Sequence, residues 1–215
     1  MSVAPRPAVP AKPSSSTPNF AHERNDSVST PPPPQQTVYD RSLARKRGEV
    51  SLSAFAYIFS EAVQYCHSRS KDVSELEHRL NLLGRHIGVR VLELTVLREG
   101  KNAKRETRLM PMLQFVHTHI WRTLFNRPAD SMQVSTEEQL QYMIIDHRPL
   151  VTEYISVPRD MSQLNCAALV AGIVQSVFSA AQFPCKVTAH SMGTDEFPDR
   201  TVYVVKFEDS VLKRV

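Results

Sequence analysis

The sequence predicts an α+β domain in which helices pack on one face of a small antiparallel sheet. In the first half of the chain, apolar residues recur at steps of three and four, the period of a helix face, whereas short β-prone runs occur in the second half. Residues 164–182 lie among those runs and are apolar on nearly every helical face, which is typical of a helix packed on several sides. Helices first, strands later and one buried helix between strands define the α+β class.

Three helices are expected before the sheet. The first spans residues 51–69, and the third spans about 107–125. The second spans about 73–98 and opens with Ser74 and, three residues later, Glu77, which is the spacing of a capping box. Each segment carries one apolar stripe, so each is expected to bury one face.

The second half is expected to supply the sheet. The linker 191–199 contains glycine, aspartate and proline, which is typical of a hairpin loop. Asn165 is the expected N-cap of the buried helix, and Pro184 is its expected stop. The β-prone runs are residues 142–145, 154–157, 186–190 and 201–207.

The composition divides the chain into a tail and one domain. Residues 1–40 hold nine of the fifteen prolines, with many serines, threonines and glutamines, so this segment cannot bury enough apolar surface to offset its ordering entropy. Residues 41–215 are enough for a single domain with its own core. No run approaches the roughly 20 apolar residues of a membrane span, and no signal peptide is recognisable. The odd number of cysteines, three, fits a reducing compartment, so a cytoplasmic protein is expected.

The residue types that carry catalysis or bind metals do not form a recognisable constellation. None of the six glycines builds a phosphate-binding loop. Cys166 opens an apolar helix, where a cysteine is usually a small core residue rather than a nucleophile. His117 and His119 are two residues apart, so on a helix they point to different faces and cannot chelate together. We therefore expect no catalytic residue, no cofactor and no metal site.

Two stretches carry a resemblance to a known family. The first is residues 149–190, with the segment from Leu164 to Ala189 as its specific part. The second contains two glycines on one helix face; glycine costs about 1 kcal/mol in a helix interior, so such a pair marks the close approach of another backbone. It reads Gly84-Arg85-His86-Ile87-Gly88. Together they resemble the small subunits of the transport protein particle (TRAPP) vesicle-tethering complex, and the resemblance covers roughly residues 41–209.

The resemblance implies a structural subunit that is not catalytic by itself. The assembled complex is known in this family as a nucleotide-exchange factor for a Rab GTPase in transport from the endoplasmic reticulum to the Golgi. The implied partners are other TRAPP small subunits, first in a heterodimer and then in the larger complex, and the Rab GTPase through that complex. A peripheral location at the cis-Golgi and endoplasmic reticulum is implied as well. No nucleic-acid partner is expected, because no nucleic-acid-binding motif is present and the basic residues are not interleaved with aromatic ones.

The first two helices are the expected partner interface. Pattern alone assigns an amphipathic stripe in a domain of this size to the core. Members of the family, however, pair side by side through these helices, and a permanent interface of that kind is large and apolar. The resemblance therefore implies that the stripes serve both purposes. The expected contact residues are Leu52, Phe55, Phe59, Val63, Leu80, Gly84, Ile87 and Gly88.

The net charge of +4 is concentrated in the expected domain. One basic cluster allows two interpretations. It could contact a membrane surface with anionic lipid or an acidic patch of a protein, or it could be only a solvated loop and helix end. The cluster consists of Arg98, Lys101, Lys104, Arg105 and Arg108.

An alternative function is a lipid- or small-ligand-binding domain that uses an apolar pocket between helices and sheet. One subunit of the family carries a fatty acyl chain on a cysteine in the loop after the glycine-bearing helix. Here that loop, residues 99–105, holds no cysteine. Acylation is therefore not expected in this chain.

Overall fold

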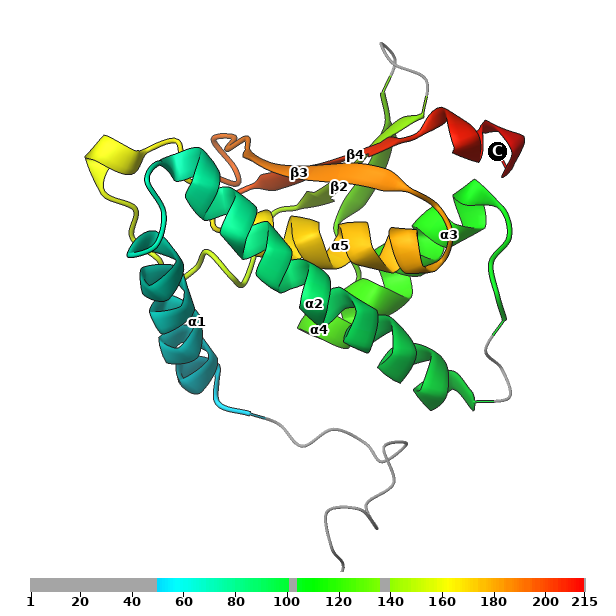
Figure 1. The fold of residues 1–215 in the computed structure, drawn as a ribbon, viewed down its shortest axis with the longest axis horizontal. Helices are drawn as coiled ribbons and strands as arrows, with labels where there is room; N and C mark the ends of the chain where they lie inside the picture. Colours follow the sequence, from blue (N-terminus) through cyan, green and yellow to red (C-terminus); the bar gives the residue numbers. More distant parts are fainter. Residues whose placement is uncertain (1–49, 101–103, 136–139, 215) are drawn as a thin grey trace, which may run out of the picture.

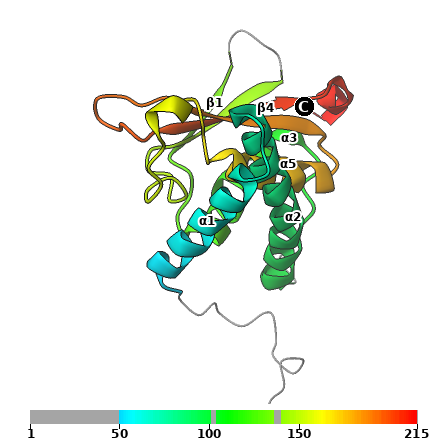
Figure 2. The same cartoon turned by 60° about the vertical axis from the view of Figure 1, so that its left-hand side comes forward.

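The computed structural model describes residues 50–100, 104–135 and 140–214. Four antiparallel strands form one sheet in the order β1-β2-β4-β3, and the helices lie on one face of it, as Figures 1 and 2 show from two directions. The expected α+β class is therefore confirmed, with helix α5 between β2 and β3 in the chain. The strands are β1 (Ser131–Val134), β2 (Gln141–Asp146), β3 (Cys185–Ser191) and β4 (Thr201–Phe207).

The helices form two layers beneath the sheet. Helix α5 (Ala168–Ala180) packs directly against β3, and α2 (Val73–Glu99) crosses over α5. Helix α1 (Leu52–His67) forms a hairpin with α2 and then diverges from it (Figure 2). The third expected helix is a continuous run of α3 (Leu109–Phe115), a π-helical turn η3 (Val116–Ile120) and α4 (Trp121–Phe125). Two short 3-10 helices, η4 (Arg159–Met161) and η5 (Asp209–Arg214), complete the described elements.

The cap of α2 differs from the one that the sequence predicts. Asp72 is the N-cap, and its Oδ1 accepts a hydrogen bond from the backbone N–H of Glu75 at 2.7 Å. The carboxylate of Glu75 in turn accepts from the N–H of Lys71 at 2.9 Å, so the reciprocal pattern begins two residues earlier than Ser74. Glu77 is used elsewhere: its Oε1 accepts from the N–H of Asn165 at 2.8 Å and ties α2 to the segment that leads into α5.

One expected strand is wrong, and one strand was not expected. Tyr154 ends a turn over residues 150–154, in which Thr152 N donates to Pro149 O and Ile155 N donates to Thr152 O, and residues 155–157 have no regular secondary structure. These local hydrogen bonds, rather than the β-prone composition, decide the backbone conformation of this segment. Strand β1 was not predicted because its polar and apolar side chains alternate over four residues only, and all four are half-buried or exposed.

Helix α5 begins three residues later than its expected cap. Asn165 Oδ1 accepts from the N–H of Ala167 at 2.9 Å, so it closes the turn before the helix rather than the first helical turn. Ten of the thirteen residues of α5 are buried, which confirms the expected buried helix. The sheet covers one side of it and α2 covers another, so an apolar surface on nearly every face is what the position requires.

A buried ionic cluster fixes the end of β2. The Asp146 carboxylate is fully buried and accepts hydrogen bonds from the guanidinium of Arg127 and from Trp121 Nε1. Arg127 also donates to the backbone carbonyl of Arg148 at 2.7 Å. A buried carboxylate without such partners would be costly, so the cluster holds α4 against the sheet at one defined position.

Candidate protein-interaction surface

The glycines of α2 form a close helix crossing inside the chain. A Cβ atom added to Gly84 would lie 1.9 Å from the carbonyl oxygen of Leu169, and one added to Gly88 would lie 2.0 Å from Ser176 Oγ. Gly172 on α5 has the reciprocal relation, with a Cβ position 2.0 Å from the carbonyl oxygen of Asn81. The sequence prediction of a close backbone approach is therefore confirmed, and the approaching backbone is that of α5.

This crossing changes the expected interface. Gly84 and Gly88 are buried against α5, and Leu80 has no exposed surface. The structure therefore places these three residues in the interior of the chain and leaves them no surface for a partner.

The expected stripe of α1 is also its inward face. Phe59 is 5% exposed and stacks on Phe55, with ring centroids 5.9 Å apart. Phe55 and Val63 are partly buried against the same core, while Leu52 at the start of the helix is 38% exposed. These four residues therefore attach α1 to the domain, and only the outer parts of Leu52, Phe55 and Val63 are accessible to a partner.

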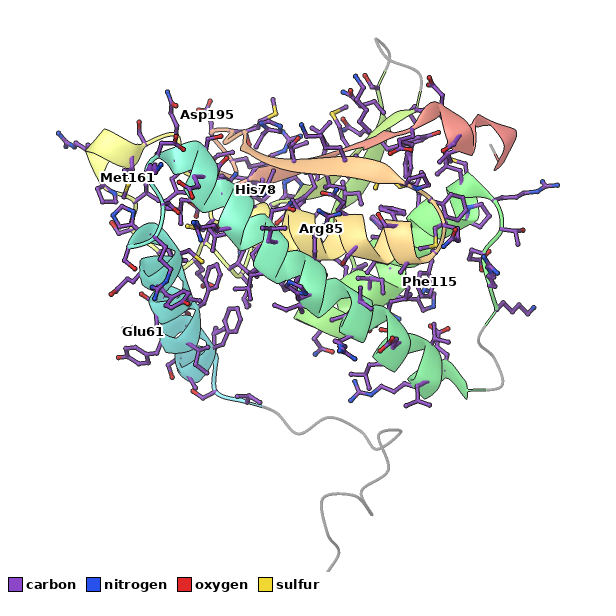
Figure 3. The ribbon with its side chains drawn as sticks, in the orientation of Figure 1. Glu61, His78, Arg85, Phe115, Met161 and Asp195 are labelled. Carbon is purple, nitrogen blue, oxygen red and sulfur yellow. The ribbon has the colours of Figure 1, made fainter. Side chains whose placement is uncertain are left out.

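A second apolar stripe on α1 faces solvent. Tyr57, Ile58 and Tyr65 are 77%, 71% and 60% exposed. Tyr57 and Tyr65 share a stripe with Glu61 at steps of four residues, and Figure 3 shows Glu61 on the side of α1 that is turned away from α2. We call Tyr57, Ile58 and Tyr65 the outer α1 face.

Sequence reasoning missed the outer α1 face because the inward stripe satisfies the helical period just as well. The number of apolar residues in α1 could have indicated it. Helix α1 carries apolar residues on two opposite sides, and one side is enough to attach a helix to a core. Several large apolar residues on one exposed helix face are typical of a protein interface.

Helix α2 adds exposed apolar residues away from its crossing with α5. Leu83 and Ile87 are four residues apart and 37% and 36% exposed, so Ile87 is the one expected contact residue of α2 that is accessible. Both lie on α2, the neighbour of α1 in the hairpin, and both are accessible to a partner.

The expected basic cluster lies at and beyond the end of α2. Lys104, Arg105 and Arg108 are exposed, and Arg98 is half-buried. Lys101 lies outside the described residues. Helix α2 ends at Glu99, beyond which Gly100 has a left-handed φ of 56°. The exposed members therefore belong to the connection between α2 and α3.

The cysteines have the character of core residues. Cys66, Cys166 and Cys185 are free and buried. Desolvation raises the pKa of Cys166 to about 11 and that of Cys185 to about 12, so both are thiols at neutral pH and poor nucleophiles. Within the described ranges, no group of three or more histidine, cysteine and acidic side chains is placed to hold a metal ion. None of the described helices is long and apolar enough to cross a membrane.

Side chains fill the space between the α3–α4 run and the middle of the sheet. Leu113, Ile120 and Trp121 are fully buried beneath the sheet, and the Trp121 ring meets Tyr203 of β4 edge to face at 5.3 Å. This close packing does not favour the alternative of an apolar ligand pocket at this position.

An exposed apolar face on a peripheral helix is typical of proteins that act by binding other proteins. The family model described as "Transport protein particle (TRAPP) component" matches residues 55–208. The chain therefore belongs to the TRAPP component family, as its two sequence stretches predict.

Named relatives point to one branch of that family. The chain is 46% identical over 179 residues to "Trafficking protein particle complex subunit 5" of Dictyostelium discoideum, covering 82% of this chain and 95% of the relative. It is 45% identical over 180 residues to the Homo sapiens protein of the same name, covering 84% and 92%. The lead-in 47–55 and the block 154–189 predict a likeness to the fifth small subunit within the family, and these relatives confirm it.

A solved structure confirms the fold. Subunit 3 of a trafficking protein particle complex from Naegleria fowleri superposes with a TM-score of 0.61 over 74% of this chain and 95% of that chain, at 12% sequence identity. That subunit is covalently bound to palmitic acid. At this identity the likeness concerns the fold alone.

Proposed function

We propose that this chain is a structural subunit of a TRAPP vesicle-tethering complex and that it joins the complex through the α1–α2 hairpin. The observation that carries the proposal is the outer α1 face. Its three large apolar residues are exposed, and apolar surface gains about 25 cal/mol for each Å² that a partner removes from water. The relatives named as subunits of a trafficking complex supply the kind of partner.

The partners in this proposal are other TRAPP small subunits, first in a heterodimer and then in the larger assembly. Leu52, Phe55, Val63 and Ile87 remain in the proposed interface through their exposed parts, and Tyr57, Ile58 and Tyr65 join them. Leu80, Gly84, Gly88 and Phe59 support the interface from within. They keep α1 and α2 in place and do not touch the partner.

The assembled complex would act as a nucleotide-exchange factor for a Rab GTPase in transport between endoplasmic reticulum and Golgi. Exchange of this kind needs no catalytic side chain. A factor that binds the nucleotide-free GTPase more tightly than the loaded one shifts the population toward release. A four-decade shift needs about 5.5 kcal/mol of differential binding, which fits an assembly better than one small subunit. The basic residues Lys104, Arg105 and Arg108 are available for an anionic membrane surface or an acidic protein.

The test is co-purification of the tagged full-length chain with the TRAPP small subunits of its own organism. Replacing Ile58 by glutamate places a carboxylate in the proposed interface, where burial without a partner is costly. We expect the I58E variant to fold normally and to lose its partner in size-exclusion chromatography with light scattering.

The matched control is Met192→Glu, which changes another large apolar residue, 55% exposed, on the β3–β4 loop. We expect this control to retain the partner. Retention of the partner by I58E, at wild-type stoichiometry, would contradict the proposed interface.

A further inference from the structure

Among the described strands, β3 has one backbone edge that no other strand covers. It is the last strand in the sheet order β1-β2-β4-β3, so within the described sheet it pairs only with β4. Glu208 N donates to Pro184 O, and Met192 N donates to Arg200 O, at the two ends of this pairing. Because antiparallel bonding alternates along a strand, the even-numbered residues of β3 bond to β4 and the odd-numbered ones point their N–H and C=O groups outward. The outward residues are Cys185, Val187, Ala189 and Ser191, of which the first two are buried, Ala189 is half-buried and Ser191 is exposed.

A groove of about 1120 Å³ runs along this edge. One wall is β3 over its full seven residues, which is about 23 Å of strand at about 3.3 Å per residue. The other wall is the first half of α2, and Figure 3 shows His78 and Arg85 on its side toward β3. Ala168 and Ala171 of α5 contribute small side chains to the lining.

Positive charge gathers at the end of the groove where β3 begins. Arg85 and Lys186 are exposed there, and Lys186 pairs in register with Lys206 of β4. Two carboxylates also line the groove, but that of Glu77 already accepts a hydrogen bond from the N–H of Asn165. Glu208 is the second, and it lies at the same end as Arg85 and Lys186, because its N–H donates to Pro184 O. The lining therefore has more cations than carboxylates, which suits an acidic ligand.

The groove and the proposed pairing surface lie on different sides of α2. Asn81 and Arg85 line the groove, whereas Leu83 and Ile87 belong to the exposed apolar surface. The two pairs are offset by two residues, which is about 200° around a helix. A partner on the α1–α2 hairpin would therefore leave the groove open.

We propose that this groove binds an extended acidic peptide segment of a partner protein, which adds a fifth strand to the sheet at β3. Backbone hydrogen bonds to Ala189 and Ser191 would supply the pairing. Small or β-branched side chains on alternate residues would lie against Ala168 and Ala171. Carboxylates at one end of the segment would meet Arg85 and Lys186.

The test measures fluorescence anisotropy with the full-length chain, co-purified with its partner subunits. The probe is a labelled peptide of three threonine–valine repeats followed by two aspartates, and its control replaces the aspartates with lysines. We expect saturable binding of the acidic peptide that is at least about tenfold tighter than that of the basic one.

Two variants separate the charge and the backbone contributions. Arg85→Glu is expected to weaken binding of the acidic peptide at least about tenfold. Arg122→Glu, which changes an exposed arginine of α4 outside the groove, should leave the affinity unchanged. Ala189→Pro removes one outward N–H and is expected to weaken binding without loss of thermal stability. Thr188→Pro removes an N–H that faces β4 and should lower the melting temperature.

Absence of saturable binding, or binding that neither Arg85→Glu nor Ala189→Pro weakens, would overturn the proposal. Subunit pairing is expected to survive Arg85→Glu. A failure of this inference is therefore distinguishable from a failure of the proposed pairing through α1.

Discussion

Helices α5 and α1 are both rich in apolar residues, but they use them in opposite ways. Ten of the thirteen residues of α5 are buried, and its Gly172 touches the backbone of α2. In α1 only two of sixteen residues, Phe59 and Cys66, are buried, while two tyrosines and an isoleucine face solvent. The apolar residues of a helix in the middle of a domain form the core, whereas those on the outer side of a helix at the margin are available to a partner.

The largest effect is expected at the α2–α5 crossing. Gly84→Leu adds a side chain whose first atom would lie 1.9 Å from a backbone oxygen of α5, and neither backbone can move without separating the two helices. We expect destabilisation by more than about 3 kcal/mol, with loss of cooperative thermal unfolding. Ala54→Leu on the exposed side of α1 is the control, and it should unfold as the wild type does. A stable Gly84→Leu variant would show that the crossing is looser than described.

The anchor of α1 should rank next. Phe59→Ala removes the one large side chain that α1 buries, and truncations of buried phenylalanines cost about 3–5 kcal/mol. Since α1 is peripheral, we expect the loss to appear as detachment of α1 while α5 stays folded. Limited proteolysis should then cut within α1 before any other described helix. Cleavage that starts in α5 or the sheet would contradict this order.

The sequence predicted the interior better than the surface. The α2–α5 crossing was predictable because glycines at a four-residue spacing are costly in a helix unless another backbone approaches, and 164–182 had no polar face. The outer α1 face was not predictable from periodicity. The stripe through Phe55 and Phe59 has the same period as the stripe through Tyr57 and Tyr65, and only the three-dimensional neighbours decide which one the core takes.

The local signals show the same limit. Two overlapping capping patterns occur at the start of α2, and the hydrogen bonds select Asp72 with Glu75 because Glu77 bonds to Asn165, which is far away in the sequence. Residues 154–157 have β-prone side chains, but they are not a strand of the described sheet. The hydrogen bonds of the preceding local turn hold this segment instead. A long-range partner decided the position of the cap, and local turn bonds decided the fate of residues 154–157; the sequence pattern alone shows neither.

A smaller effect is expected from the cap of α2, which helps to set the α1–α2 hairpin. Asp72→Ala removes the acceptor for the N–H of Glu75 and should cost about 1 kcal/mol. Ser74→Ala, which changes the cap that the sequence pattern favours, should be close to neutral. Chemical denaturation of the two variants compares them directly. Equal losses would mean that the register of the cap is not the one described.

The smallest effect concerns pH and the π-helical turn that links α3 to α4. Burial lowers the pKa of His117, and the nearby Asp130 opposes that shift. The unfolded chain therefore binds a proton more readily than the folded one, so this histidine contributes stability that is present above its unfolded pKa and is lost as the pH falls below it. We expect acidification through pH 6.5 to destabilise the wild type more than a His117→Gln variant. Identical pH profiles of unfolding for the wild type and His117→Gln would show that His117 does not cause the loss of stability in acid.

Hydrogen exchange of the backbone amides, compared between the isolated chain and its complex with TRAPP small subunits, tests the difference between the two helices most directly. Amides of α5 should exchange slowly in both states, because the chain itself buries this helix on several sides. Amides of α1 should exchange much faster in the isolated chain and become protected in the complex. Equal protection of α1 in both states would contradict the assignment of its outer face to a partner.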